Sequence, residues 1–323
     1  MSFPKLLGLA TALVVVSSCG DTVTDPDPDP DPVVPELGKI VFASAGDIWA
    51  MNDDGSGRIS LTSDGATDDT PSWSSDGARI VFSRDGNIHV MNADGSDPVM
   101  VSSSAQRDQF PHMSPNGQQI AFSRDVDQIE VPQIFVINVD GTGETNLTNN
   151  FPLDCFQPMG PPPTWTAAED CLFEAWPRWS PDGQQILFNS APLPADADIW
   201  VMNADGTGRR SVSNSPDKER NDFFASWSPN GDEIAFSGAA GWLIDGLAPD
   251  DIYVVNIDGT GLRTVTANVG PARNIGPGWS PDGAQLVFHQ EGGGGIFKID
   301  SDGANQIELD AGAYPDWAIG PMN

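Results

Sequence analysis

The residues that could perform acid–base or metal chemistry in this chain are few. Against 46 Asp plus Glu there are three histidines, His89, His112 and His289. Their spacing does not match a short metal motif such as H-x-x-x-H, and no G-x-S-x-G nucleophile elbow occurs. We therefore predict no catalytic constellation, no metal site and no cofactor. Histidines that are distant in sequence could still meet in space, so the elements that position them must be identified.

Those elements are copies of one repeat. The decapeptide WSPDGQQILF, from Trp179 to Phe188, recurs as WSSDGARIVF at Trp73, MSPNGQQIAF at Met113, WSPNGDEIAF at Trp227 and WSPDGAQLVF at Trp279. Turn formers and a glycine between apolar stretches indicate a strand, a tight turn and a second strand. A third strand of the type IWVMN, an N-x-D-G turn and a fourth strand complete each unit. The array therefore predicts four-stranded antiparallel units.

The two ends of the array complement each other. The first unit begins at Gly38 with GKIVF and lacks a strand with Trp, whereas the last stretch, PDWAI around Trp317, is that strand alone. Five internal units and this composite make six, and a closed ring would leave no free sheet edges. We predict an all-β fold over residues 37–323, a six-bladed β-propeller whose last blade is closed by both termini.

The repeat resembles a known family. W-S-P-D-G-x-x-I-x-F followed by I-[WYF]-V-M-N-x-D-G is similar to the PD40 repeat of the TolB-like propellers, and the resemblance covers residues 38–319. That family includes periplasmic TolB, whose propeller is a docking platform for an envelope lipoprotein, and the propellers of prolyl-oligopeptidase-type enzymes. The resemblance implies an envelope protein or peptide as partner. TolB has a separate domain before its propeller, where this chain has an acidic spacer, so we expect a protein distinct from TolB.

Two other functions are compatible with the repeat. Oligogalacturonate lyases resemble this repeat family and work with a metal on a propeller face, which makes a carbohydrate-active enzyme the first alternative. That function requires a histidine cluster and a cationic cleft, whereas this chain has a formal net charge of -31. The same charge repels phosphate backbones and excludes nucleic acid as a partner. A structural envelope scaffold is the second alternative, and a monomer is expected.

The amino end has the features of a lipoprotein precursor. Residues 1–18 carry Lys5 and an apolar run too short to span a bilayer, which is typical of a secretory signal. The run ends VSSC, which resembles a bacterial lipobox, so Cys19 is the predicted lipidation site and the membrane is contacted through this anchor alone. The alternative is an ordinary signal peptide with an incidental cysteine. Residues 19–36 contain DPDPDPDP, an extended acidic spacer. The predicted location is the bacterial envelope, at the periplasmic face or the outer membrane.

Loop lengths indicate which face carries function. Nine residues separate the inner-strand Trp or Met from the second-strand Phe in every copy, so the connections that vary all fall on the opposite face. The largest insertion contains Cys155 and Cys171, predicted to form a disulfide rather than two free thiols. Aromatic residues in the variable connections form either small local cores or a contact surface; the candidates for ligand binding are Trp165, Trp176, Phe223, Phe224 and Trp242.

A second set of candidates lies in the inner strands. The residue before each inner-strand Trp or Met is Ser72, His112, Arg178, Ser226, Gly278 or Asp316. His112, Arg178 and Asp316 break this pattern with titratable groups, so we predict ligand contacts there, at the mouth of a central channel. The aspartates of the N-x-D-G turns could bind calcium, but each has a local role in its turn, and structural use is favoured.

Overall fold

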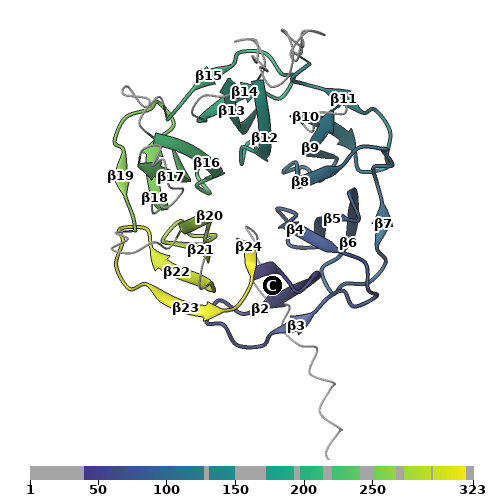
Figure 1. The fold of residues 1–323 in the computed structure, drawn as a ribbon, viewed down its shortest axis with the longest axis horizontal. Helices are drawn as coiled ribbons and strands as arrows, with labels where there is room; N and C mark the ends of the chain where they lie inside the picture. Colours follow the sequence, from purple (N-terminus) through teal and green to yellow (C-terminus); the bar gives the residue numbers. More distant parts are fainter. Residues whose placement is uncertain are drawn as a thin grey trace, which may run out of the picture. The chain divides into compact units, whose positions relative to one another are not determined.

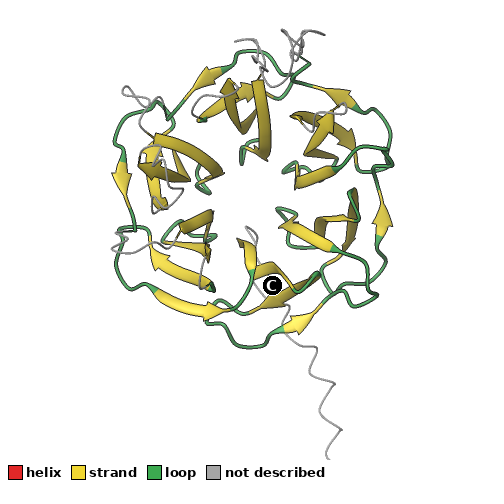
Figure 2. Cartoon of the chain, viewed as in Figure 1, coloured by secondary structure: helices red, strands yellow, loops and turns green. Residues whose placement is uncertain are grey.

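The computed structural model describes residues 40–126, 131–149, 172–192, 197–213, 220–240, 250–266, 273–291 and 294–317. These residues form six four-stranded antiparallel sheets arranged as blades around an axis (Figures 1 and 2). The predicted all-β, six-bladed propeller is confirmed. Among the described residues there is no helix long and apolar enough to cross a membrane.

Each blade runs from an inner strand at the axis to a short outer strand. Five blades follow the chain order, and their strands are β4 (Asp68–Trp73), β5 (Arg79–Arg84), β6 (Asn87–Asn92) and β7 (Val99–Met100); β8 (Asp108–Met113), β9 (Gln119–Val126), β10 (Val131–Asn138) and β11 (Thr145–Asn146); β12 (Leu172–Trp179), β13 (Gln185–Pro192), β14 (Asp198–Asn203) and β15 (Arg210–Ser211); β16 (Arg220–Trp227), β17 (Glu233–Ala240), β18 (Asp250–Asn256) and β19 (Arg263–Thr264); β20 (Arg273–Trp279), β21 (Gln285–Glu291), β22 (Ile296–Asp300) and β23 (Ile307–Asp310).

The sixth sheet combines distant parts of the sequence. Its strands are β24 (Ala313–Trp317), β1 (Ile40–Ser44), β2 (Asp47–Met51) and β3 (Ile59–Ser60), in that order from the axis. β24 pairs antiparallel with β1, with Ile40 opposite Trp317. Both strands therefore have a hydrogen-bonded neighbour that lies near the other end of the described chain (Figure 1).

The hydrophobic core lies between blades. The second-strand phenylalanines are almost completely buried, and they are Phe42, Phe82, Phe122, Phe188, Phe236 and Phe288. Each apolar cluster draws on two neighbouring blades; Val41 and Ile48, for example, pack with Trp73 and Phe82. Every blade is covered on both faces by its neighbours. The constant nine-residue spacing puts the phenylalanines at the same height in each blade, so that they pack in layers between blades.

The N-x-D-G turns join blades as well as strands. Gly95 has a φ of +84°, and a Cβ atom built on it would lie 2.5 Å from the carbonyl oxygen of Leu61 in the preceding blade. Glycine is needed for both the conformation and the close approach. In the same turn, Asp94 Oδ1 accepts a hydrogen bond from the Ser96 N–H at 2.9 Å. The turn carboxylates thus have the local role predicted for them.

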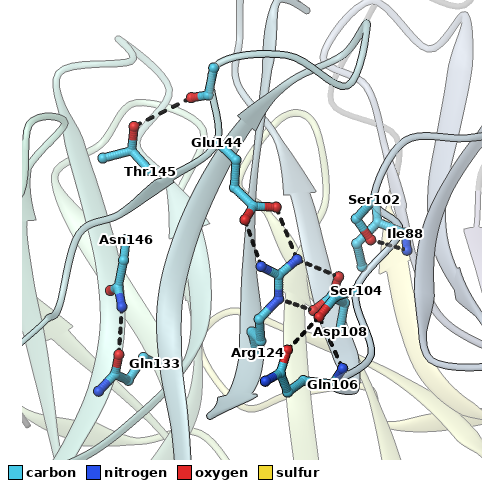
Figure 3. Close-up of polar contacts among 11 residues, drawn as sticks. Ile88, Ser102, Ser104, Gln106, Asp108, Arg124, Gln133, Glu144, Thr145 and Asn146 are labelled. Carbon is cyan, nitrogen blue, oxygen red and sulfur yellow. Dashed lines mark hydrogen bonds and ion pairs between the residues drawn. The ribbon is translucent and has the colours of Figure 1, made fainter.

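A buried ion pair ties the inner strand to the second strand of a blade. In the blade of β8 and β9, Arg124 donates from Nε to Asp108 Oδ1 at 2.6 Å and from Nη2 to Oδ2 at 2.9 Å (Figure 3). Its Nη1 also donates to Glu144 Oε1 at 2.6 Å. Asp108 is fully buried, so this bidentate pair compensates a carboxylate that water cannot reach. Arg84 and Asp68 form the equivalent pair in the blade before it.

Candidate functional site on the propeller axis

All six inner strands share one backbone irregularity. In each, the strand-pairing register shifts near the residue three positions before the Trp or Met. That residue has a left-handed backbone in every blade: Thr70 (φ 50°), Phe110 (53°), Trp176 (58°), Phe224 (52°), Gly276 (66°) and Tyr314 (50°). Such a conformation costs a residue other than glycine about 1 kcal/mol or more. Strain repeated in five residues of this kind indicates that the bulge has a use at the axis.

The preceding blade supplies the acceptor for the bulge. Trp176 N–H donates to Ser123 Oγ at 2.9 Å, and Phe224 N–H donates to Asn189 Oδ1 at 3.2 Å. Tyr314 N–H donates to His289 Nδ1 at 3.4 Å. In these blades the residue after the second-strand Phe holds the neighbouring bulge in place, whereas the Phe110 N–H donates to Thr70 Oγ1 at 3.3 Å.

This role accounts for His289. Burial, with a contribution from the Arg273 charge, lowers the pKa of the His289 imidazole to about 4, so Nδ1 is an acceptor at neutral pH. Its ring also contacts Tyr314, with centroids 5.0 Å apart. His89 instead lies half-buried against Phe82 in a third strand. Within the described ranges, no group of three or more His, Cys, Asp or Glu side chains is placed to hold a metal ion.

The bulges gather four aromatic rings at the axis. We call Phe110, Trp176, Phe224 and Tyr314 the axial aromatic cluster. Trp176 and Phe224 have centroids 4.3 Å apart, and Phe110 lies 5.8 Å from Trp176 and 5.9 Å from Tyr314. All four residues are half-buried, and the space left among them and their neighbours is about 30 Å³. The cluster therefore nearly fills the axis while keeping part of each residue accessible.

The cluster lies toward the variable loops. Each inner strand starts from a connection of variable length and ends at an S-P-D-G-type turn, and the cluster residues come before the titratable ones along that strand. His112, Arg178 and Asp316 are two residues further along, which at about 3.3 Å per residue is roughly 7 Å nearer the constant turns. The sequence-based hypothesis treated the channel mouth and the variable face as one site. Arg178 connects the two, because it also lines the small space beside Trp176 and Phe224.

The three titratable residues line a second cavity, of about 190 Å³, and Arg178 also lines the small space among the aromatic rings. Asp316 Oδ2 accepts hydrogen bonds from Ser72 Oγ at 3.1 Å and from the Trp73 N–H at 2.8 Å. His112 Nδ1 accepts a hydrogen bond from the Trp179 N–H at 3.1 Å, which places the proton of the neutral ring on Nε2. In the described part of the chain, no hydrogen bond or ion pair involves the Arg178 guanidinium.

The side chains of His112, Arg178 and Asp316 are largely surrounded by protein, although they line a space that water can enter. Burial, and then the nearby Arg178 charge, lowers the pKa of His112 well below 6.5, so the ring is neutral at pH 7. Burial also lowers the pKa of Arg178, with the Asp316 charge opposing the shift. Burial raises the pKa of Asp316, while Arg178 and the two hydrogen-bond donors oppose that shift. The cavity thus places one desolvated cation and one desolvated anion near each other without a direct contact.

The remaining predicted site residues fall into two groups. Phe223 is buried, with Phe224 edge-on at 5.6 Å and the Arg273 guanidinium 5.9 Å from its ring, so it packs within the ring of blades. Outside the described residues lie Cys19, Cys155, Cys171, Trp165 and Trp242. Sequence analysis missed Phe110 and Tyr314. The signal was present, because each precedes the proline of its inner strand, in the same repeat position as Trp176.

Comparison with known proteins agrees with the fold and the repeat. The family model of the TolB beta propeller domain, PD40, matches residues 176–314. An uncharacterised protein of Agrobacterium fabrum is 28% identical over 199 residues, 47% of this chain and 62% of that protein. Tol-Pal system protein TolB of Anaeromyxobacter dehalogenans is 30% identical over 103 residues, 32% of this chain and 21% of that protein. The chain therefore spans less than two thirds of the length of these relatives.

Solved structures show the same architecture. TolB from Acinetobacter baumannii matches with a TM-score of 0.66 and 15% identity, over 87% of this chain and 66% of that one. An oligogalacturonate lyase in complex with manganese matches with a TM-score of 0.53 and 14% identity, over 86% and 75%. Identities this low show the fold alone. Repeats, blades and matches together define a six-bladed β-propeller of the PD40 type. This chain is a TolB-like propeller.

Proposed function

We propose that this protein is a lipid-anchored module of the bacterial envelope that binds a protein or peptide at the variable-loop end of its propeller axis. The observation that carries the proposal is the axial aromatic cluster. Four partly accessible aromatic residues, held by strained backbone on a rigid ring, have the composition of an interface centre, where aromatic anchors dominate binding energy.

The chemistry of the cluster suits a peptide. The indole Nε1–H of Trp176 is buried and has no hydrogen-bond partner in the described part of the chain, as is also true of Trp73, Trp179 and Trp279. A peptide carbonyl that displaced water at the cluster would satisfy this donor while its side chains packed on the rings. Similarity to a protein of the Tol-Pal system supports an envelope partner.

The anchor is the second part of the proposal. Cys19 would be acylated, and residues 19–36 would form an extended acidic spacer between the membrane and the propeller. Replacement of Cys19 by Ser should release the protein from the membrane fraction and prevent incorporation of labelled fatty acid. A wild-type protein that is recovered without lipid would refute this part alone.

A partner-capture experiment tests the binding site. The full-length protein with a photo-crosslinker near the axis is incubated with envelope extract, and captured proteins are compared for wild type, Trp176→Ala and Met100→Ala. Met100 is 53% exposed on the outer strand β7, so its truncation is a control remote from the axis. A partner lost with Trp176→Ala and retained with Met100→Ala is expected. Equal capture by all three proteins would contradict the proposed site.

The two alternatives make different predictions. A polysaccharide lyase predicts product release from polygalacturonate and dependence on a bound transition metal. A structural scaffold predicts that deletion of residues 150–175 has no consequence for the cell.

A further inference from the structure

The cavity at the other end of the axis has features that the proposed function does not use. Its lining includes Ser74, Pro115 and Pro181 from the constant turns, together with His112, Arg178, Ser226 and Asp316 from the inner strands. It therefore lies on the side of the axial aromatic cluster away from the variable loops. Its volume of about 190 Å³ leaves room for several water molecules.

The inner strands direct backbone donors toward the axis. In every chain-ordered blade, the serine after the inner-strand Trp or Met donates its N–H to the second strand, as Ser228 does to the Glu233 carbonyl oxygen. Antiparallel alternation then points the N–H of the preceding residue away from the second strand. The bonds from Trp73 to Asp316 and from Trp179 to His112 show that these N–H groups reach the neighbouring blade's side chain at the axis.

Arg178 and Ser226 place hydrogen-bond donors on the wall of this cavity. At the position where Asp316 and His112 each accept an N–H, the next two blades carry Arg178 and Ser226. Arginine is only a donor, so it cannot accept the N–H of Trp227. The Ser226 hydroxyl is buried and has no hydrogen-bond partner in the described part of the chain, and no described side chain accepts the N–H of Trp227 or Trp279. A group that accepts hydrogen bonds and enters this cavity would find donors in the Arg178 guanidinium and the Ser226 hydroxyl.

A carboxylate is the acceptor that fits. It is planar, accepts two parallel hydrogen bonds from a guanidinium and has lone pairs left for neighbouring N–H and O–H groups. A doubly charged phosphate fits less well, because Asp316 lies across the same cavity and the whole chain has a net charge of -31.

We propose that the axial cavity is a binding site for a carboxylate group, held by Arg178 together with the Ser226 hydroxyl and the inward N–H groups of β16 and β20. The carboxylate belongs to a small organic acid or to a peptide, as an acidic side chain or a C-terminus. The inference does not depend on the partner proposed above, because none of the four axial aromatic cluster residues lines this cavity.

Acetate is the simplest probe, and acetamide is its uncharged isostere. Binding to the full-length protein is followed by ligand-detected NMR and by the unfolding midpoint in millimolar acetate, acetamide or chloride. Acetate alone should bind and raise the midpoint, because a ligand that binds only the folded state stabilises it. Arg178→Gln should weaken acetate binding at least tenfold. Arg263→Gln, which removes the same charge from the exposed surface, should leave it unchanged.

A second variant adds a carboxylate instead of removing the arginine. Gly278 occupies the next position of the same ring, and a Cβ atom there would meet only ordinary contacts, the nearest at 3.4 Å from Val287. Gly278→Asp should abolish acetate binding with Arg178 intact. Three titrations distinguish the possible sources of the carboxylate. Succinate represents a small organic acid, a peptide with a glutamate and an amidated C-terminus represents an acidic side chain, and a peptide with a free C-terminus represents a chain end. Equal responses to acetate and acetamide, or tight acetate binding by folded Arg178→Gln, would overturn the inference.

Discussion

His289 should make the propeller sensitive to acid, and its replacement by Asn should remove that sensitivity. Asn is the matched substitution, because Asn189 holds the bulge of the next blade from the equivalent position. His289 is 4% exposed, and its Nδ1 accepts the Tyr314 N–H. Protonation of Nδ1 would therefore remove an acceptor and leave a charge in the core.

The magnitude follows from the pKa of the imidazole, which is about 4 in the folded protein and 6.5 as a model value. Between these values the unfolded chain binds a proton that the folded chain does not, so stability falls as the pH falls. At about 1.36 kcal/mol per pKa unit, the complete loss is about 3.4 kcal/mol, of which roughly 2.4 kcal/mol is reached by pH 4.5. The stability that the neutral His289 ring contributes to the folded protein is present at neutral pH and is lost on acidification.

Urea unfolding at pH 7.0 and pH 4.5 measures this difference. The loss of unfolding free energy between the two pH values should be about 2 kcal/mol smaller for His289→Asn than for wild type. Other titrating groups are shared by the two proteins and affect both equally. One of them is Asp222, whose pKa is raised to about 6 by burial, so that its protonation favours the folded state as the pH falls. His89→Asn, at a half-buried position, should change the loss much less. An identical loss for wild type and His289→Asn would refute the argument.

Two further predictions concern the stability of the ring. Arg124→Met should lower the free energy of unfolding by about 3 kcal/mol, because it leaves the fully buried Asp108 without its partner. As a control in the same urea titration, Arg263→Met removes one side of the partly exposed Arg263–Glu233 pair and should cost less than about 1 kcal/mol. Gly95→Ala should cost about 2 kcal/mol or more, since it adds a methyl group 2.5 Å from the Leu61 carbonyl oxygen at a left-handed position; an unchanged thermal midpoint would contradict this.

The repeat made the architecture predictable. Spacing from Trp179 to Phe188 and from Asn203 to Val212 sets strands and turns, and every copy repeats it, so errors in one unit are corrected by the others. The site was predictable only in part. Arg178 and Asp316 stood out because they interrupt a column of small residues. Phe110 was missed because the left-handed bulge turns its residue toward the axis, and a simple two-residue strand alternation does not anticipate that.

The sequence also could not show that the axis is divided. A layer of aromatic rings lies between two spaces, and Arg178 lines both of them whereas Trp176 lines only one. That layer depends on how rings from four blades pack against one another, which is a property of the assembled ring and not of any single repeat.

The pairing of β24 with β1 has a consequence for how the chain folds. Blades of consecutive strands can form from local contacts, but this sheet joins residues from nearly the whole length of the described chain. Long-range closure is slow because the loop entropy is lost before the contacts form. The last blade should therefore assemble late, and until β24 arrives the two flanking blades present uncovered apolar faces. Folding intermediates of this protein should be prone to aggregation, and a chain stalled before Ala313 should remain open.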